Sequence, residues 1–368
     1  MKIFSGIQPT GKLHIGNYFG AIQNMVKLQD ENEAIFSIVD LHALTVPYDP
    51  KEMPQRIKDT LLDFLASGIN PEKSIIFIQS HIKEHAELAY ILSNIMPIGE
   101  LQRMTQFKDK AQKEIVPQDN DPKMNEFRDK IAKDINIPFN EIFKPENKKR
   151  LDDEIMHLRE KRSINAGLLI YPMLMAADIL LYDTDMVPVG DDQKQHLELT
   201  QDIVRRFNNR FGEIFKSPKV TIPQNGARIM SLSDPLRKMS KSEPNGCLFM
   251  TDSPEEIEKK IKAAVTDTER IINFDPEKRP ALANLLTIYS LCEEKPIKEL
   301  TLNFDGHAEF KKALTESLIK KFLPIREKRK ELEQKPDYIK KVLEEGRAKA
   351  QILASKKMNQ IKKAIGLL

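Results

Sequence analysis

The sequence predicts an α/β protein, in which a parallel sheet with flanking helices occupies about residues 1–245 and an all-α region follows at about 246–368. In the first 100 residues, short apolar runs alternate with helical patterns, as they do where helices connect the strands of a parallel sheet. From Ser253 onward the pattern is wholly helical. Ser253 is a good helix N-cap, and Glu255 and Glu256 lie near the positive helix end.

Each element follows from apolar spacing and from the residues that begin or end helices. For example, Pro54 suits a first helical turn, Ile57, Leu61 and Leu65 share one face, and Gly68 ends the helix. The predicted strands are 2–5, 34–39, 74–78 and 185–189. The predicted helices begin at 17 and then span 54–68, 84–96, 98–108, 167–181 and 191–211.

Composition excludes several classes of protein. No apolar run approaches the roughly 20 residues of a membrane helix, and the N-terminus lacks the apolar stretch of a secretion signal. The two cysteines, Cys247 and Cys292, are too few for a disulfide scaffold or a Cys-rich metal site. We therefore expect a cytoplasmic protein without a membrane span.

The charge is unevenly distributed. Residues 309–368 carry 17 Lys/Arg and 8 Asp/Glu, a balance of +9, so the rest of the chain carries −6 to give the net +3. A basic end on an acidic body suggests a polyanionic partner. Solvated helix faces explain the same charges about equally well.

Two short strings suggest phosphate chemistry. PTGKLHIGN, residues 9–17, follows the first strand; a glycine-rich turn that opens a helix presents N–H groups to an anion, and Gly16 permits close approach. An ordinary strand-to-helix turn is the alternative. In RKMSKS, residues 237–242, Lys238 and Lys241 could fold over a triphosphate and neutralise departing pyrophosphate. A solvated basic loop is the alternative, but such a five-residue string arises by chance in only about one sequence in ten thousand.

These strings carry a family resemblance. HIGN at 14–17 resembles the HIGH signature of class I aminoacyl-tRNA synthetases, with Asn17 in the fourth place, and KMSKS at 238–242 matches the second signature outright. A third string, at 165–182 and 187–196, narrows the resemblance to bacterial tryptophanyl-tRNA synthetases. It is joined by FSGIQP at 4–9, Val39-Asp40 and MTQFK at 104–108, and the resemblance covers nearly the whole chain outside 111–163.

The resemblance implies the fold, the partners and the site. It implies a Rossmann-like catalytic domain at 1–245, an anticodon-binding helical domain at 246–368, a homodimer, and tRNA(Trp), L-tryptophan and ATP as substrates, with Mg²⁺ bound through the ATP phosphates and not by a metal site of the chain. The residues implied for tryptophan are Phe4, Ser5, Gln8, Val39, Tyr171, Met175, Asp178, Val189 and Gln193. Those implied for ATP are Gln8, Pro9, Thr10, Gly16, Asn17, Gly190, Asp191, Asp192, Ile229, Lys238, Met239, Ser240, Lys241 and Ser242. The catalytic group comprises His14, Lys108, Lys110, Lys238 and Lys241.

Asp178 is the residue by which the predicted site recognises its substrate. It lies on an apolar helix, where a lone buried carboxylate is costly and requires a donor. An indole N–H is donor-only and matches a carboxylate. A site that reads such a group rejects analogues lacking it by roughly 10⁴–10⁵, so no editing domain is required. Without the resemblance, a pairing of Asp178 with a buried Arg or a helix cap would be favoured.

Three functions remain to be weighed. The first is tryptophan–tRNA ligase, in which the amino acid's carboxylate attacks the α-phosphorus of ATP in line, without a protein nucleophile. The second is tyrosine–tRNA ligase, but a phenol requires both a donor and an acceptor, and the helix around Asp178 offers one acceptor. The third is a non-catalytic synthetase paralogue, which is disfavoured because no signature residue is lost.

Residues 111–163 are predicted to be an unusual polar insertion in the catalytic domain. The segment contains 12 basic and 12 acidic residues and few apolar ones, and it splits Lys108 and Lys110 from the segment that begins at Asn165. Its balanced charge argues against a simple phosphate-gripping arm, because RNA contacts require net positive charge. We expect a helical excursion over the active-site mouth or at the dimer interface.

Overall fold

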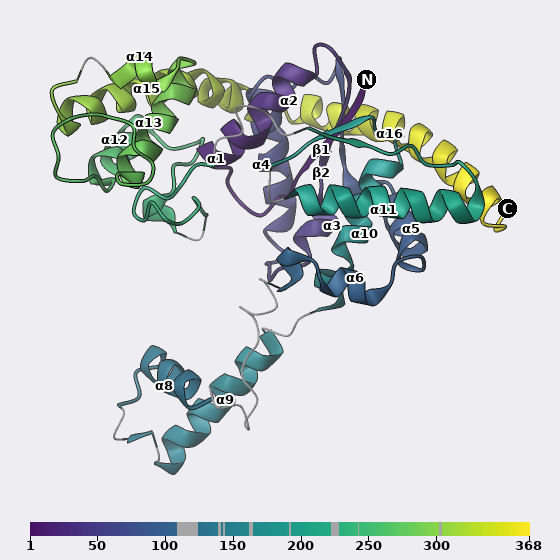
Figure 1. Cartoon of the computed structure of the whole chain (residues 1–368), viewed down its shortest axis with the longest axis horizontal. Coiled ribbons are helices and arrows are strands. Elements are labelled where there is room, and N and C mark those ends of the chain that lie inside the picture. Colours follow the sequence, from purple (N-terminus) through teal and green to yellow (C-terminus); the bar gives the residue numbers. More distant parts are fainter. Residues whose placement is uncertain are drawn as a thin grey trace.

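The computed structural model describes residues 1–108, 124–138, 141–142, 144–161, 165–190, 193–221, 228–241, 243–301 and 304–368. Within them lies a five-stranded, all-parallel sheet of order β3-β2-β1-β4-β5 (Figure 1). The strands are β1 Lys2–Ile7, β2 Glu33–Ile38, β3 Ser74–Ile78, β4 Met186–Pro188 and β5 Lys219–Thr221. The chain runs from β1 to one side of the sheet and returns on the other at β4. The carboxyl ends of β1 and β4 therefore form a topological switch point, where open α/β sheets bind ligands.

The four predicted strands are confirmed; β3 has the predicted bounds and the bounds of the other three differ by one or two residues. β5 was not predicted. It contains only Lys219, Val220 and Thr221 and pairs with β4 along its whole length. A strand this short has no period-2 pattern of its own to detect, so its position is set by its neighbour in the sheet.

Helices cover both faces of the sheet. Because successive side chains of a strand point to opposite faces, Ile3 lies in one apolar cluster and Phe4 in the other. The first cluster includes α4 and α15 and the second α5, α10 and α11. The helices of the amino-terminal part are α1 Ile15–Asn17, α2 Gln23–Leu28, α3 Asp40–Ala43, α4 Met53–Ala66, α5 Glu84–Ser93, α6 Ile98–Gln102, α10 Ala166–Leu180 and α11 Lys194–Phe211, with a π-helical turn at Tyr18–Ile22 and a 3₁₀ turn at Gln79–His81.

The carboxyl-terminal part is helical with one interruption. Its helices are α12 Pro254–Ala263, α13 Pro280–Glu293, α14 Ile297–Leu300, α15 His307–Glu333 and α16 Pro336–Ala364. Ser253 caps α12 in a capping box with Glu256, which confirms the predicted N-cap. The prediction of a wholly helical chain is wrong for residues 265–279. There the buried Arg279 forms an ion pair with Asp267 and donates to the backbone oxygens of Ile271 and Glu269, at 2.6 and 3.2 Å, so it satisfies two carbonyl groups outside a helix.

The last helix leaves the other carboxyl-terminal helices and returns to the sheet. In Figure 1, α12–α15 lie together on the left, whereas α16 runs across to the side of α5. Its Ala350 and Ala354 are fully buried in the same apolar cluster as α5 and α10. Its Lys357 forms an ion pair with Asp183. The domain boundary near 245 stays a prediction.

The described part of segment 111–163 forms two helices, α8 Met124–Asp134 and α9 Pro145–Lys161, which lie apart from the sheet in Figure 1. They share a small apolar cluster that includes Met124, Ile131, Leu151 and Ile155. A polar sequence therefore still contains enough apolar residues to hold a helical pair. That the segment is an insertion, and what it does, stay predictions.

Two further observations bear on the class of protein. Among the described residues no helix is long and apolar enough to span a membrane. Cys247 and Cys292 are free, buried thiols.

Candidate functional site

The glycine-rich turn after β1 is held by a segment from far along the chain. Residues 13–15 are hydrogen-bonded to 248–250, and His14 pairs antiparallel with Phe249. The Asn17 side chain accepts a hydrogen bond from the backbone N–H of His14 at 3.1 Å. The fourth residue of the HIGH-like string is thus the third residue of its helix, and its side chain reaches back to the N-cap residue His14 as in a capping box.

His14 is buried beneath this turn and is uncharged. Its side chain contacts Gly16, where an added Cβ would lie 2.9 Å from the imidazole ring. Burial, reinforced by the positive charges of Lys241 and Lys238, lowers the pKa of His14 to about 4. At neutral pH the ring therefore acts as a neutral hydrogen-bonding group, and its buried Nδ1 has no partner among the residues that the structure describes.

One arm of a small hairpin contains residues 238–241 of the KMSKS string. Met230 pairs antiparallel with Lys238, and Met239 donates its backbone N–H to Ile229 at 3.0 Å. The Asn284 side chain bonds both backbone groups of Met230, at 2.9 and 3.0 Å, so α13 fixes the hairpin. Met239 is buried, Lys238 is exposed and Lys241 is half-buried, so the two lysines of the string lie in different surroundings.

Lys241 joins the two signature strings. Its Nζ donates to Thr10 Oγ1 at 3.2 Å and to the backbone oxygen of Gly11 at 3.0 Å. Burial lowers the pKa of Lys241 to about 8, although the carboxylate of Asp63 partly opposes the shift. A cation is therefore placed on the anion-binding turn at the carboxyl end of β1.

Asp178 lies on α10 at the bottom of the site and is 2% exposed. The expectation of a carboxylate without a protein donor is wrong. Asp178 accepts from Gln79 at 2.7 Å, from His85 Nδ1 at 2.6 Å and from His42 Nε2 at 2.9 Å. Burial alone would raise the pKa of Asp178, but the bonds from His42 and His85 and their nearness lower it, so the group is ionised. The alternative partners, a buried Arg or a helix cap, are not the ones observed.

Aromatic side chains lie beside the histidine partners of Asp178, with Tyr182 at 5.5 Å from His85 and Tyr171 at 6.4 Å from His42 between ring centroids. Phe4 stacks on Tyr182 with ring centroids 5.8 Å apart. The Tyr171 hydroxyl donates to Gln106 Oε1 at 3.0 Å and also contacts His196 Nε2. Val39 is buried, and a Cβ at Gly6 would lie 2.7 Å from it, so the strand glycine makes room for this side chain.

The structure brings most of the predicted residues to the carboxyl ends of the strands. Gln8, Pro9 and Thr10 follow β1, and Val189 and Gly190 follow β4. Also described are Ser5 in β1, Met175 on α10, Gln193 before α11, Ile229 beside Gly16, Ser240 in the hairpin and the exposed Lys108. Lys110, Asp191, Asp192 and Ser242 lie outside the described residues.

Sequence reasoning missed the partners of Asp178. His42 stands four residues beyond β2 and Gln79 directly follows β3. Polar residues just beyond two neighbouring parallel strands were a signal that they share an edge with β1. His85 and Tyr182 offered no such signal, since each reads as an ordinary residue of a helical pattern.

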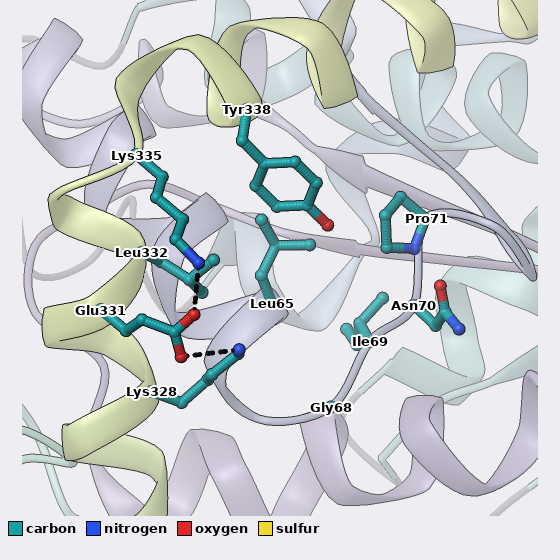
Figure 2. A pocket seen from close by; sticks show the side chains of 10 residues that line it. All are labelled: Leu65, Gly68, Ile69, Asn70, Pro71, Lys328, Glu331, Leu332, Lys335 and Tyr338. Atoms are coloured by element: carbon teal, nitrogen blue, oxygen red, sulfur yellow. Dashed lines mark hydrogen bonds and ion pairs between the residues drawn. The ribbon is translucent and has the colours of Figure 1, made fainter.

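The cavity in Figure 2 lies beside the amino end of β3, whereas the site described above lies at the carboxyl ends of the strands. Its 360 Å³ is lined by Gly68, Ile69 and Pro71, which precede β3, and by residues such as Lys328 and Tyr338 from α15 and α16. Because the amino end of β3 faces it, the cavity is separate from the site just described. In the described residues, no group of three or more His, Cys, Asp or Glu side chains is arranged to hold a metal ion.

Comparison with known proteins decides the family. The model described as "tRNA synthetases class I (W and Y)" matches residues 1–128 and 139–323. The chain belongs to the class I tRNA synthetases. It is 45% identical to a tryptophan–tRNA ligase of Oceanobacillus iheyensis, over 99% of this chain and 98% of that protein.

Solved structures agree with this family. The tryptophanyl-tRNA synthetase of Mycoplasma pneumoniae matches with a TM-score of 0.79 at 33% identity, covering 100% of this chain and 98% of that one. That of Campylobacter jejuni, complexed with ADP and tryptophan, matches with 0.75 at 34% and covers all of both chains. The predicted Rossmann-like fold and the resemblance carried by the signature strings are thereby confirmed for this synthetase.

Proposed function

We propose that this synthetase is a tryptophan–tRNA ligase. It joins L-tryptophan to ATP, releases pyrophosphate, and transfers tryptophan from the adenylate to tRNA(Trp). The observation that carries the proposal is the full-length similarity to a tryptophan–tRNA ligase at 45% identity. The ionised carboxylate of Asp178, which can only accept hydrogen bonds, supports it, because an indole presents a single N–H donor.

In this proposal the ATP phosphates bind the turn after β1, and the adenylate part lies at the switch point between β1 and β4. The ammonium of Lys241 neutralises charge on the departing pyrophosphate from its position beside Thr10 and Gly11, and Lys238 assists. The attacking nucleophile is the carboxylate of tryptophan, so the protein's part is to position the two substrates and to stabilise the charge that develops. Mg²⁺, a hard cation, is held through phosphate oxygens.

Tyrosine–tRNA ligase is the alternative with the same fold, and Asp178 argues against it. The three donors that face this carboxylate, on Gln79, His85 and His42, are already bonded to it. A phenol oxygen placed there could donate to Asp178 but would compete with it for a donor. Leaving a buried hydroxyl half satisfied costs about 1–3 kcal/mol, which favours the indole.

The remaining partners follow from this function. The exposed lysines and arginines of 309–368 are proposed to contact tRNA, as their +9 balance favours. We propose a homodimer working in the cytoplasm, where tRNA is charged. Sedimentation at micromolar concentration should give twice the 42.3 kDa of one chain, and a monomer would contradict the dimer.

The absence of tryptophan from the chain provides a direct test of the proposed function. With excitation that selects indole over phenol, the added tryptophan is the only emitter, and its bound fraction is distinguished from the free fraction by wavelength. Near Phe4, Tyr171 and Met175 the indole loses contact with water, so its emission should shift to shorter wavelength and saturate as the complex fills. L-Tyrosine in excess should displace little of it, and tryptophan-dependent pyrophosphate exchange should accompany the signal. An unshifted, linear signal at concentrations that support exchange would place the indole elsewhere.

A further inference from the structure

A buried hydrogen-bonded chain runs from Asp178 away from the substrate. His85 bonds Asp178 Oδ1 through Nδ1 at 2.6 Å and the Tyr182 hydroxyl through Nε2 at 2.8 Å. His85 is fully buried, and Tyr182 and Asp178 are each 2% exposed. The mechanism outlined above assigns no role to Tyr182, one helical turn beyond Asp178. An uninterrupted chain of this kind polarises every member and is costly if any one is lost.

The direction of each hydrogen bond follows from the charges. Asp178 is ionised and can only accept, so His85 carries a hydrogen on Nδ1. On a ring that carries only this hydrogen Nε2 is an acceptor, and the Tyr182 hydroxyl donates to it. Burial, followed by the nearby charges of Asp178 and Glu84, raises the pKa of Tyr182 well above its usual value. Tyr182 therefore keeps its proton and remains a donor.

The lone pairs of Asp178 can be counted on this basis. An ionised carboxylate accepts about four hydrogen bonds, two on each oxygen. Oδ1 receives two, from Gln79 and His85, and is full. Oδ2 receives one, from His42 Nε2, and retains one open position.

We infer that Tyr182, acting through His85, is a positioning residue for amino-acid selectivity. By fixing the His85 tautomer it keeps Oδ1 saturated, so that Asp178 offers one acceptor position, on Oδ2, to the substrate N–H. This inference rests on the proposed function. It goes beyond that function in assigning part of the selectivity to a side chain that does not touch the substrate.

Tyr182 has this effect because His85, without the hydroxyl bonded to its Nε2, can adopt other protonation states. It can place its hydrogen on Nε2, which turns a lone pair toward Oδ1, or it can take a second proton, which partly neutralises Asp178. Either state lets the carboxylate rotate or weakens its remaining acceptor position. The Tyr182 ring is held independently by packing, with Phe4 at 5.8 Å and Phe77 at 5.7 Å between centroids. Removing only the hydroxyl should therefore leave the fold intact.

The test is Tyr182→Phe, assayed by amino-acid-dependent pyrophosphate exchange. The substrates are L-tryptophan and 3-(benzothien-3-yl)-L-alanine, in which sulfur replaces the N–H. The variant should lower the ratio of their kcat/KM values about 3- to 10-fold, the range expected when one hydrogen bond is weakened. The loss should appear in the KM for tryptophan, with kcat and the analogue's constants little changed. Tyr289→Phe, on α13 and packed on Phe304 and Phe310, is the matched control and should leave the ratio unchanged.

A second variant separates positioning from packing. His85→Asn places an amide N–H where Nδ1 lies but cannot bond Tyr182. If Tyr182 acts through His85, Tyr182→Phe should change the ratio in the wild-type background and have no further effect beside His85→Asn. An unchanged ratio in Tyr182→Phe, or the same loss in both backgrounds, would overturn the inference. Failure of the proposed function looks different, because wild-type protein would then show no tryptophan-dependent exchange at all.

Discussion

Lys241→Ala should lower kcat for tryptophan-dependent pyrophosphate exchange about 100-fold and leave the KM for tryptophan nearly unchanged. Lys241 reaches the phosphate-binding turn through Thr10 and Gly11, at 3.2 and 3.0 Å, and lies far along the chain from the Asp178 end of the site. A preorganised group that stabilises charge developing in the transition state typically contributes 10²–10³ in rate. Because that charge is on pyrophosphate, the loss belongs to kcat and not to amino-acid binding.

Lys241 also predicts a pH dependence. Its lowered pKa of about 8 means that the free enzyme holds a neutral amine above that pH and an ammonium below it. ATP binds the ammonium, so binding above pH 8 must take up a proton, and the Kd for ATP should rise about tenfold per pH unit there. Lys241→Arg stays charged and should flatten this rise.

Lys298→Ala is a control for loss of one surface charge, because Lys298 is exposed on α14. It should leave both kcat and the pH profile unchanged. If Lys241→Ala instead weakened tryptophan binding as much as it slowed activation, the KMSKS hairpin would be shaping the amino-acid end of the site. The assignment of Lys241 to the phosphates would then be wrong.

The fold was largely predictable because local patterns determine most of it. The strand at 74–78 was predicted at its observed bounds, and Ser253 caps its helix through neighbours three residues away. β5 was not predictable, since three residues have no periodicity and are set by pairing with β4. Neither was the loop at 265–279, where Arg279 pairs with Asp267 and with the backbone oxygens of Ile271 and Glu269.

The residues of the site also divide into those that the sequence predicts and those that it does not. The chemistry of contiguous strings can be recognised from the sequence, and such strings contain Thr10, Gly16 and Lys241. The surroundings of Asp178 come from four separate segments, with His42, Gln79 and His85 lying 136, 99 and 93 residues away from it in the chain. Only the sheet order brings these residues together, so reasoning from one helix treated the carboxylate as alone.

The packing of α16 on the sheet depends on a single glycine. An added Cβ at Gly346 would lie 1.7 Å from the carbonyl oxygen of Ile76 and 2.7 Å from its carbon. Ile76 belongs to β3, whose backbone is fixed by pairing with β2, so the strand cannot move aside. Helix α16 would have to retreat instead, which would strain the bonds of Gln351 and Ser355 to Glu84, at 2.6 and 2.8 Å.

Gly346→Ala should therefore lower the free energy of unfolding by about 2 kcal/mol, measured by urea denaturation. Overpacking costs about 1–3 kcal/mol and more against a rigid backbone, whereas the better helix propensity of alanine returns only about 1 kcal/mol. Gly99→Ala is the matched control. Gly99 is also helical, its nearest neighbour is the flexible Arg103 guanidinium at 4.0 Å, and alanine there should be neutral or stabilising. Equal stability of Gly346→Ala and wild type would show that α16 does not approach β3 this closely, and that the carboxyl-terminal helix is held to the sheet by its side chains alone.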